Sequence, residues 1–519
     1  RMADALRLSK DTDIEALAEA VEGRDSFPQF VGTGTQPIYW KRTDLGIVQE
    51  FLDRHRDKLR RVVDIALSDR DGFAWWCGTH WVIGVDANRY IWGEYYAMAQ
   101  EARDAARMIY DKLKVEQREL KPNEAKFVKF ADAMESAGAG RDFLTVLGRV
   151  EAEKLWVKIG DFDQDIMLLN FRNGTVDLRT GQLLPHNPAN FITKLIPVDY
   201  DPNADQTLWR KFLERIQPPE RIDFLQRWAG YSATGSTKEK KFLVALGMSN
   251  TGKSVFWNAI AGALGQDYAI TSSVETFEDT KRSPQGPSED LAALRGVRLV
   301  ILPEPHEGYK LSDALIKRAT GGDDIRARRM RENGFTFTPQ FSLVYYTNFA
   351  IRFDGGDSGM QTRYCECSFD VVIPKEEQDN SLKDQFAGQY RAGILAWIVQ
   401  GAVAWYKDGL GIPESVRAST GARIESQDAI GQFISTYFEI GDEGLMEPVA
   451  NVYALYLYDA EEQGTRFPMS KRALAQKLDD RGYPSQKVGN QMYRLKLSVK
   501  EECRPLLQTD AGGRYDRYR

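Results

Sequence analysis

Three runs of mainly apolar residues lie in the middle of the chain and predict buried β-strands. They are Phe242–Leu246, Val297–Leu302 and Phe341–Tyr346. After the first run, apolar pairs recur at helical spacing from Val255 to Leu264, and Gly265 stands where that helix should end. Short buried strands that alternate with helices are typical of an α/β fold, so we expect an α/β core in this part of the chain.

Patterns typical of helices dominate the rest of the chain. Apolar residues recur at helical spacing in five stretches: Thr43–Phe143, Asp205–Lys240, Ser381–Tyr406, Phe433–Tyr458 and Ser470–Arg481. Between the first two, the turn signals Asn173-Gly174 and Thr180-Gly181 predict a small β element. Short strands are expected around Tyr493–Leu497, and residues 1–40, which mix charge with Gly and Pro, are interpreted as a linker or arm.

A chain of 519 residues is too long for one core and predicts about three or four domains. We divide it into a linker or arm (1–40), a mainly helical N-terminal domain (41–204), a helical collar (205–240), the α/β core (241–375), a helical extension (376–425) and a C-terminal domain (426–519). From Arg466 to Arg519 there are 13 basic and six acidic residues. A helix-rich unit with a basic hairpin predicts a winged-helix-like DNA-binding domain, and a lid that touches no DNA is the alternative.

Composition narrows the class of protein. The net charge is −6, with 69 basic against 75 acidic residues, so a nucleic-acid site would have to be a local patch. Four cysteines form no CxxC pair and four histidines complete no zinc pattern, which predicts a reducing compartment and no structural metal. No apolar run approaches the roughly 20 residues of a membrane span, and no signal peptide opens the chain. We expect a soluble cytoplasmic protein, and the initial Arg1 suggests a piece of a longer polypeptide.

A glycine-rich turn joins the first predicted strand to its helix. Gly247-x-x-x-x-Gly252-Lys253-Ser254 matches a phosphate-binding loop in its proper context, after a strand and before a helix. Backbone N–H groups and the positive end of the helix can face a polyphosphate there. Lys253 is expected to reach the β and γ phosphates of ATP, and the Ser254 hydroxyl to bind Mg²⁺. The predicted nucleotide-binding residues are Gly247, Asn250, Thr251, Gly252, Lys253 and Ser254.

Polar side chains follow the other two predicted strands. Glu304 comes directly after the second strand, where a carboxylate can hold Mg²⁺ and activate a water. Glu307 is either its partner or a solvated loop carboxylate. Asn348 follows the third strand, where an amide can orient the hydrolytic water. The sequence thus predicts that Lys253, Glu304 and Asn348 belong to one ATPase site.

A basic segment lies between the second and third strands. Lys310–Glu332 carries seven basic and four acidic residues, and Asn333-Gly334 predicts the tip of a hairpin. Arginines that project from a hairpin beside a nucleotide site suit contact with a DNA phosphate backbone. The alternative is a solvated charged face. The predicted DNA-binding residues are Lys317, Arg326, Arg328, Arg329 and Arg331.

A cluster of tryptophans in the N-terminal part has two interpretations. Trp75, Trp76 and Trp81 either fill the core of a small domain or stack on bases. The core interpretation is favoured, because tryptophans are commonly buried.

Two further patterns are compatible with metal ligation but are interpreted otherwise. The stretch DFDQD at 161–165 is not an EF-hand, because Ile166 and Arg172 stand where Gly and Glu are required. A surface turn is favoured over a polymerase-type carboxylate pair. Cys365 and Cys367 alternate with polar residues and are predicted on the buried face of a strand.

The order of these motifs resembles a known family. GMSNTGKS, RLVILPEPHEG, LIKRATGGDDIRARRM and LVYYTN follow one another as in the superfamily 3 helicases, specifically the phage and plasmid helicase-primase branch with its poxvirus relatives. The resemblance covers roughly residues 60 to 500. It implies an AAA+-like ATPase that assembles as a hexameric ring, unwinds duplex DNA and often lies downstream of a primase or primase-polymerase domain.

The resemblance also implies an arginine that is supplied to the ATP of the neighbouring subunit. Arg363 in GMQTRYCECSF occupies the expected place, and Arg352 is the alternative. The chain departs from the family pattern at Tyr364, where a second arginine is frequent. A second departure is PEPHE at 303–307, where paired acids or small polar residues are usual.

The leading hypothesis from the sequence is an ATP-dependent replicative DNA helicase, encoded by a phage or plasmid and acting in the cytoplasm of a bacterial host. Its cofactors would be ATP and Mg²⁺, and its partners DNA, further copies of the chain and a primase. One alternative is a P-loop NTPase of a defence or packaging system that does not unwind DNA. Another is an origin-binding assembly factor in which nucleotide only stabilises the ring.

Overall fold

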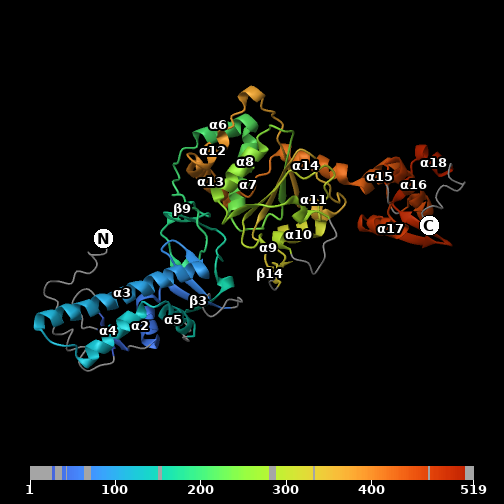
Figure 1. The fold of residues 1–519 in the computed structure, drawn as a ribbon. Coiled ribbons are helices and arrows are strands. Elements are labelled where there is room, and N and C mark those ends of the chain that lie inside the picture. The colour runs from blue at the N-terminus through green and yellow to red at the C-terminus, as the bar shows by residue number, and fades with distance from the viewer. Residues whose placement is uncertain are drawn as a thin grey trace. The chain divides into compact units, whose positions relative to one another are not determined.

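The computed structural model describes residues 26–29, 38–41, 44–63, 72–149, 155–279, 288–330, 334–442, 444–465 and 468–508. The chain divides into two compact units, Arg1–Asp201 and Pro202–Arg519 (Figure 1). Within the described ranges, none of the helices combines the length and the apolar character needed to cross a membrane. The finer domain boundaries given above stay predictions.

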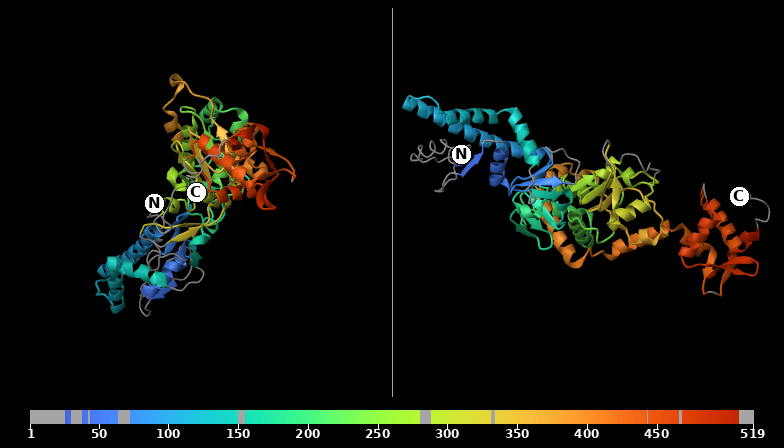
Figure 2. Two further views of the ribbon diagram at one scale, coloured as in Figure 1. Left: turned by 90° about the vertical axis from the view of Figure 1, so that its right-hand side faces the viewer. Right: turned by 90° about the horizontal axis from the view of Figure 1, so that it is seen from below.

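Helices and a four-stranded sheet make up most of the first unit. The helices are α2 (Asp44–His55), α3 (Val85–Glu116), α4 (Pro122–Met134) and α5 (Ala137–Arg149). The strands are β3 (Leu59–Val63), β4 (Phe73–Trp76), β5 (Trp81–Ile83) and β6 (Trp156–Lys158), in the order β5-β4-β3-β6. The long helix α3 lies beside α4 (Figure 2), and their apolar faces share one core with α2 and α5. The mainly helical prediction is therefore confirmed, and the aromatic stretch that begins at Phe73 forms the strands β4 and β5.

Two smaller sheets complete the first unit. β7 (Leu168–Phe171), β8 (Gly174–Asp177) and β9 (Gln182–Leu184) form an antiparallel sheet. Its two turns are the predicted ones, so the small β element is confirmed. β1 (Ser26–Gln29) pairs antiparallel with β2 (Ile38–Lys41), so part of the segment interpreted as a linker or arm consists of paired strands.

The aromatic stretch of this unit belongs to the core. Trp75 and Trp81 are 2% and 0% exposed. The ring of Trp81 stacks on Phe191 at 5.6 Å, and Trp76 lies against it at 5.9 Å. A buried ring presents no face to a nucleic acid, so the core interpretation is confirmed for Trp75 and Trp81.

The DFDQD stretch is a surface turn, as the sequence predicts. Asp163 accepts a hydrogen bond from the backbone N of Thr193 at 2.9 Å. Asp165 forms an ion pair with Arg179 at 2.8 Å. These carboxylates therefore serve to hold the turn against the neighbouring segments.

A five-stranded parallel sheet forms the centre of the second unit. Its order is β11 (Ala269–Thr271), β12 (Leu299–Pro303), β15 (Ser342–Thr347), β10 (Phe242–Leu246) and β16 (Tyr364–Ser368). Every neighbouring pair is parallel. The three strands predicted from the sequence are the inner ones, because a parallel strand covered on both faces has a continuous apolar run. Helix α8 (Lys253–Leu264) follows β10 and ends at Gly265, as predicted.

Helices cover both faces of this sheet. α8 packs with α12 (Leu382–Ala387) and α13 (Arg391–Asp408), and its Phe256 stacks on Trp209 of α6 (Thr207–Ile216). α7 (Pro219–Ala233) packs on α13. On the other face, the core includes side chains from α9 (Glu289–Ala292), α10 (Asp313–Gly321), α11 (Ser358–Gln361) and α14 (Glu414–Gln427). The α/β class predicted for this part of the chain is confirmed.

Two glycines bring α7 and α13 into backbone contact. A Cβ atom on Gly230 of α7 would lie 2.0 Å from the backbone N of Ala402. A Cβ atom on Gly401 of α13 would lie 2.0 Å from the carbonyl O of Gln226. Only glycine permits this approach, which seats α13 firmly between α7 and α8.

The edge strand β16 is buried more completely than the sequence predicts. Cys365 and Cys367 are buried as expected, and burial raises the pKa of the Cys365 thiol to about 12. Glu366 was expected on the other, polar face, but it is only 4% exposed. Its carboxylate accepts a hydrogen bond from the Tyr364 hydroxyl at 2.6 Å and pairs with Arg423 of α14 at 2.9 Å. The arginine of α14 makes this burial possible, and nothing in the sequence around β16 predicts that α14 packs there.

Helix α14 also covers the outer backbone of β16. The backbone N of Glu366 donates to the Thr420 hydroxyl at 2.9 Å. The hydroxyl of Ser419 donates to the carbonyl O of Glu366 at 2.9 Å. These two side chains replace the hydrogen bonds that a further strand would supply.

A short antiparallel hairpin interrupts the α/β pattern between β12 and β15. Its strands are β13 (Ile325–Ala327) and β14 (Phe335–Phe337). The hairpin predicted from the sequence is therefore confirmed, while Asn333 of its expected Asn333-Gly334 tip lies outside the described residues.

The C-terminal part has a core of its own. It contains α15 (Ala429–Tyr437), β17 (Phe438–Ile440), β18 (Met446–Pro448), α16 (Val449–Glu462), α17 (Lys471–Asp480), β19 (Ser485–Val488), β20 (Gln491–Leu495), β21 (Leu497–Val499) and α18 (Pro505–Gln508). The strands pair as β18-β20-β19 and β17-β21. The helical pattern predicted over Phe433–Tyr458 is in fact two helices, because β17 and β18 separate α15 from α16.

Candidate nucleotide-binding site

The loop between β10 and α8 has the backbone that its glycines predict. Asn250 and Gly252 both adopt left-handed conformations, with φ of 62° and 83°. A Cβ atom on Gly252 would lie 2.8 Å from the Ile216 side chain, and one on Gly247 would lie 2.2 Å from the carbonyl O of Phe369. Glycine at both positions lets the loop fold tightly against its neighbours.

Lys253, the first residue of α8, is folded into this loop. Its side chain is buried, and its ammonium bonds the carbonyl oxygens of Gly247 at 2.7 Å and Met248 at 2.6 Å. It also contacts the Thr251 hydroxyl at 3.2 Å and the amide oxygen of Asn348 at 3.1 Å. Burial lowers the pKa of Lys253, and the nearby carboxylate of Glu304 opposes this effect.

The surroundings of Lys253 fit a polyphosphate. All four acceptors are neutral oxygens, so the hydrogen bonds of this buried cation are made to dipoles and not to an opposite charge. An anion that replaced them would interact more strongly with the ammonium, because a full negative charge attracts a cation more strongly than a carbonyl or hydroxyl dipole does. The donor set therefore suits an anionic ligand at this position.

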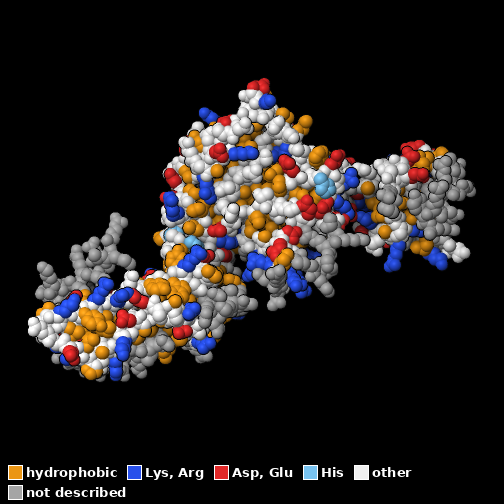
Figure 3. Space-filling view, in the orientation of Figure 1, with side chains coloured by type: hydrophobic (Ala, Val, Ile, Leu, Met, Phe, Trp, Pro, Cys, Tyr) orange, Lys and Arg blue, Asp and Glu red, His pale blue; other side chains and the backbone are white. Residues whose placement is uncertain are grey.

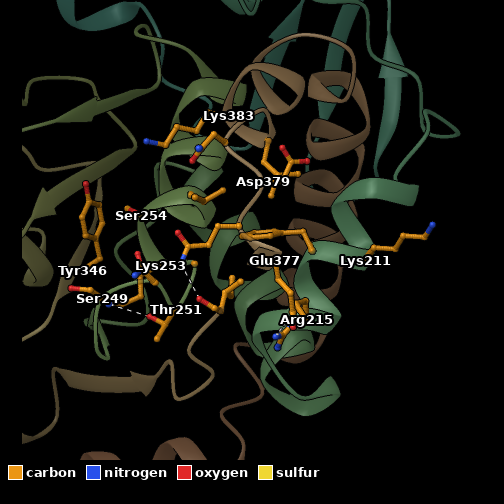
Figure 4. Close-up of a pocket in the computed structure, with 18 of the residues that line it drawn as sticks. Lys211, Arg215, Ser249, Thr251, Lys253, Ser254, Tyr346, Glu377, Asp379 and Lys383 are labelled. Carbon is orange, nitrogen blue, oxygen red and sulfur yellow. Dashed lines mark hydrogen bonds and ion pairs between the residues drawn. The ribbon is translucent and has the colours of Figure 1, made fainter. Parts of the chain in front are cut away.

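A cavity of about 580 Å³ opens beside the loop (Figure 4). Ser254 lines it from the start of α8, Glu304 from the end of β12, and Tyr346 and Asn348 from the end of β15. The structure thus brings together Lys253, Ser254, Glu304 and Asn348 as the sequence predicts. Pockets of about 300–1,000 Å³ are usual for small-molecule ligands, so the size suits a nucleotide.

Glu304 has an unusual backbone for a residue with a side chain. Its φ of 47° is left-handed, and its N–H donates to the carbonyl O of Tyr346 at 2.9 Å. Such a conformation costs of order 1–3 kcal/mol and is concentrated at functional sites. The contact to β15 thus fixes the backbone from which the carboxylate reaches the cavity.

The second acidic residue of the PEPHE motif is placed differently. Glu307 is not among the residues that line the cavity, although it is exposed. Between the two acids, His306 pairs with Glu278 at 2.8 Å. The backbone carbonyl of Glu307 and the carboxylate of Glu278 raise the pKa of His306. Of the two acidic residues of this motif, only Glu304 lines the cavity.

One wall of the cavity was not predicted from the sequence. It consists of one face of α6 and of the segment from Ile373 to Lys383 that follows β16. Arg215 of α6 and Glu377 of that segment form an ion pair at 2.6 Å. The backbone N of Ile373 donates to the carbonyl O of Asn250 at 2.9 Å, which ties the segment to the phosphate-binding loop. This wall is assembled from segments far apart in the chain, so no local motif marks it.

Neither candidate for the trans arginine lines the cavity. Arg363 immediately precedes β16, so it lies at the amino end of the sheet, whereas the cavity is at the carboxyl end. A five-residue strand separates the two edges by roughly 16 Å. Arg352 is exposed, and its backbone bonds Tyr309 and Leu311. For Arg363, this separation places the residue away from the nucleotide cavity of its own subunit.

The residues predicted to bind DNA fall into two groups. Arg326, Arg328 and Arg329 are exposed on the hairpin or directly after its first strand, where basic side chains gather near β14 (Figure 3). Lys317, in contrast, belongs to α10 and forms an ion pair with Asp357. Arg331 lies outside the described residues. The hairpin arginines are therefore better placed for DNA than Lys317.

Comparisons with known proteins agree with the sequence motifs. Residues 49–218 match the family described as D5 N terminal like. A candidate helicase of Acanthamoeba polyphaga mimivirus is 23% identical over 300 residues, which is 53% of this chain and 31% of that protein. Candidate helicases of Invertebrate iridescent virus 6 and Sputnik virophage are 24% and 27% identical, over 43% and 40% of this chain and 24% and 28% of those proteins. The chain spans about a third or less of the length of these relatives.

A solved structure is also similar, namely the apo structure of the C-terminal region of NrS-1. It covers 58% of this chain and 78% of that chain, with 11% identity and a TM-score of 0.38. Together, the family match and the viral relatives confirm the resemblance to the phage-type helicase-primases that the motifs predict.

Proposed function

We propose that this relative of the phage-type helicase-primases is an ATP-dependent replicative DNA helicase, the motor part of a phage or plasmid replication protein. The observation that carries the proposal is the meeting of Lys253, Ser254, Glu304 and Asn348 around one cavity at the carboxyl ends of parallel strands. In open α/β sheets, this edge is where ligands bind.

The topology of the second unit supports an AAA+-like motor. Its strand order places the strand of the phosphate-binding loop, β10, between β15 and β16. The carboxylate strand β12 and the amide strand β15 then lie next to each other, so that Glu304 and Asn348 line the same cavity. The C-terminal part, with helices and paired strands, suits a winged-helix-like domain that binds DNA.

Each residue has a role in the proposed reaction. Lys253 would exchange its loop carbonyls for phosphate oxygens, and Ser254 with Glu304 would hold Mg²⁺. Bound Mg²⁺ would neutralise phosphate charge. Asn348 accepts from Lys253 and would orient the attacking water by its amide. Glu304 would accept the proton of that water.

The position of Arg363 supports an assembly of several subunits. Because it lies at the opposite edge of the sheet from its own cavity, its guanidinium would serve the nucleotide of a neighbouring copy. An arginine supplied in this way typically raises the rate by about 10³–10⁵. We propose a closed ring, a hexamer, in which the hairpin with Arg326, Arg328 and Arg329 contacts DNA in the channel.

Mixed assemblies test the proposal. Lys253→Ala should abolish ATP hydrolysis, and Arg363→Ala should abolish it while nucleotide binding is retained. When the two inactive variants are mixed, activity should return at interfaces where an intact loop meets an intact arginine. Arg352→Ala is the matched comparison, because it decides between the two arginines: it should keep its activity if Arg363 is the one supplied.

Three outcomes would contradict the proposal. Unchanged hydrolysis in Lys253→Ala would refute the nucleotide site. Hydrolysis without strand separation on a forked duplex would favour the NTPase of a defence or packaging system. Turnover near zero with DNA binding indifferent to Glu304→Gln would favour an origin-binding assembly factor.

A further inference from the structure

The side chain of Arg363 is held in a defined place within its own subunit. Its Nε donates to the Thr320 hydroxyl at 3.0 Å, and its Nη1 donates to the carbonyl O of Gly359 at 2.8 Å. These bonds use two of the five N–H donors of a guanidinium, which leaves donors for an acceptor from another molecule. We infer that Thr320 is the positioning residue that aims Arg363 at the neighbouring nucleotide. The inference rests on the proposed function of Arg363.

The hydrogen bonds of Thr320 are consistent with this role. Its hydroxyl donates to the carbonyl O of Ile316, one turn earlier in α10, at 2.7 Å. The hydroxyl proton is thereby committed, so the oxygen presents its lone pairs to Arg363. Thr320 is only 3% exposed, so packing holds this acceptor in one place. The bond to Ile316 already satisfies the hydroxyl donor, so the bond from Arg363 is not needed to satisfy it.

The backbone of Arg363 is fixed independently of its side chain. Its N–H donates to the carbonyl O of Met360 at 3.0 Å. Its carbonyl O accepts from the backbone N of Phe242, the first residue of β10, at 3.0 Å. Only the side-chain torsions remain adjustable, and Thr320 restrains them through the innermost nitrogen of the guanidinium.

Thr320 also stands between the arginine and the DNA hairpin. It belongs to the last turn of α10, which ends at Gly322 in a left-handed conformation with φ of 78°. Only Asp323 and Asp324 separate that cap from β13, the first strand of the hairpin. A movement of the hairpin would therefore reach Thr320 through a short and ordered connection. Helix α10 thus links the proposed DNA contact of the hairpin to the orientation of the Arg363 side chain.

Two substitutions isolate the hydroxyl of Thr320. Thr320→Val keeps the volume and removes the acceptor of the Arg363 Nε–H, while the carbonyl of Ile316 retains its helical hydrogen bond. Thr320→Ser restores the acceptor. A hydrogen bond to a charged group accounts for about 1.5–3 kcal/mol, so Thr320→Val should lower ATP turnover by about tenfold or more. Nucleotide affinity should stay unchanged, and Thr320→Ser should recover most of the turnover.

Mixed assemblies show whether the loss of turnover acts through the arginine. The reference is Arg363→Ala mixed with Lys253→Ala, in which each active interface takes its arginine from the Lys253→Ala subunit. Adding Thr320→Val to the Lys253→Ala subunit should lower the activity of the mixture by about the same tenfold. Adding Thr320→Val to the Arg363→Ala subunit should leave the activity unchanged. Both mixtures contain the same substitutions, so a general folding defect would affect them equally.

Each result has one meaning. An equal decrease in both mixtures, or a decrease confined to the Arg363→Ala subunit, would overturn the role of Thr320. Unchanged turnover in both would overturn it as well. No activity in the reference mixture, with mixed assemblies present, would instead refute the shared site itself. Should Thr320→Val fail to fold, Thr320→Ala with Thr320→Ser as its control repeats the comparison.

Discussion

The close packing of α7 on α13 yields a prediction in which two effects of one substitution oppose each other. Gly230→Ala places a methyl group where the backbone N of Ala402 would be 2.0 Å away and the carbonyl carbon of Gly401 2.2 Å away. Carbon contacts are optimal near 3.5–4.0 Å, so the helices must separate by more than about 1 Å. The neighbours are backbone atoms, which cannot rotate away.

The sizes of these two effects decide whether Gly230→Ala stabilises or destabilises the second unit. Replacing a helical glycine by alanine stabilises by about 1 kcal/mol through helix propensity. Overpacking in a closely packed region costs about 1–3 kcal/mol, and here the obstacle is rigid, so the upper part of that range applies. We expect Gly230→Ala to lower the free energy of unfolding of the second unit by about 1–2 kcal/mol. Gly421→Ala in α14 is the matched control, because a Cβ there meets nothing within 4 Å.

Hydrogen exchange of the amides in α7 and α13 measures the effect where it arises. Exchange should accelerate in both helices for Gly230→Ala by about tenfold, which corresponds to about 1.4 kcal/mol. For Gly421→Ala, exchange should slow in α14 and remain unchanged in α7 and α13. Slower exchange in these helices for Gly230→Ala would show that helix propensity outweighs the overpacking. An equal loss of stability for Gly421→Ala would show that the contact with α13 is not the cause.

Three further predictions follow from other parts of the structure. Burial by itself would raise the pKa of the Cys77 thiol, but hydrogen bonds with His80 and Thr79 outweigh it and lower that pKa to about 6. Iodoacetamide should therefore label Cys77 in the folded protein at pH 7, and the labelling rate should decrease as the pH falls through about 6. Cys365 should react only after unfolding. A midpoint above pH 8 for the labelling of Cys77 would contradict the lowered pKa. Arg423→Met leaves the buried carboxylate of Glu366 with the Tyr364 hydroxyl but without its opposite charge. The free energy of unfolding in urea should therefore fall by about 2–3 kcal/mol. For Arg417→Met, at an exposed position of the same helix, it should fall by less than about 0.5 kcal/mol. Alanine at Arg326, Arg328 or Arg329 should lower the slope of log DNA affinity against log salt concentration by about one unit for each DNA phosphate that the variant no longer binds. Lys317→Ala should leave the slope unchanged, because the ammonium of Lys317 is already paired with Asp357. Equal slopes for the four variants would show that the hairpin is not part of the DNA interface.

The parts of the fold that the sequence predicted are those with local causes. Phe242–Leu246 is an inner strand because it is apolar on both faces. Gly252 suits the left-handed turn before α8 because glycine adopts a positive φ without a steric penalty. Glu304 and Asn348 could be placed because the ends of parallel strands meet at one edge. In each case, a few consecutive residues carry the whole signal.

The parts that were missed depend on distant segments. The ion pair of Arg215 with Glu377 joins residues 162 positions apart, and an exposed charge in either segment is unremarkable by itself. Glu366 was expected on a polar face because its burial depends on Arg423, which no pattern near β16 announces. Lys317 was grouped with the hairpin arginines by charge, although its helix directs it to Asp357. The sequence shows where charged residues stand, but only the fold shows which of them are already paired with another residue.

The covering of β16 by α14 has a consequence for the solubility of an assembly. An uncovered edge strand offers a row of unpaired N–H and C=O groups on which another sheet can grow. A protein that brings several copies together raises the local concentration of every such edge. Thr420 and Ser419 close this one by hydrogen-bonding both sides of Glu366. These two hydroxyls would therefore protect the assembly against fibrous association through this edge.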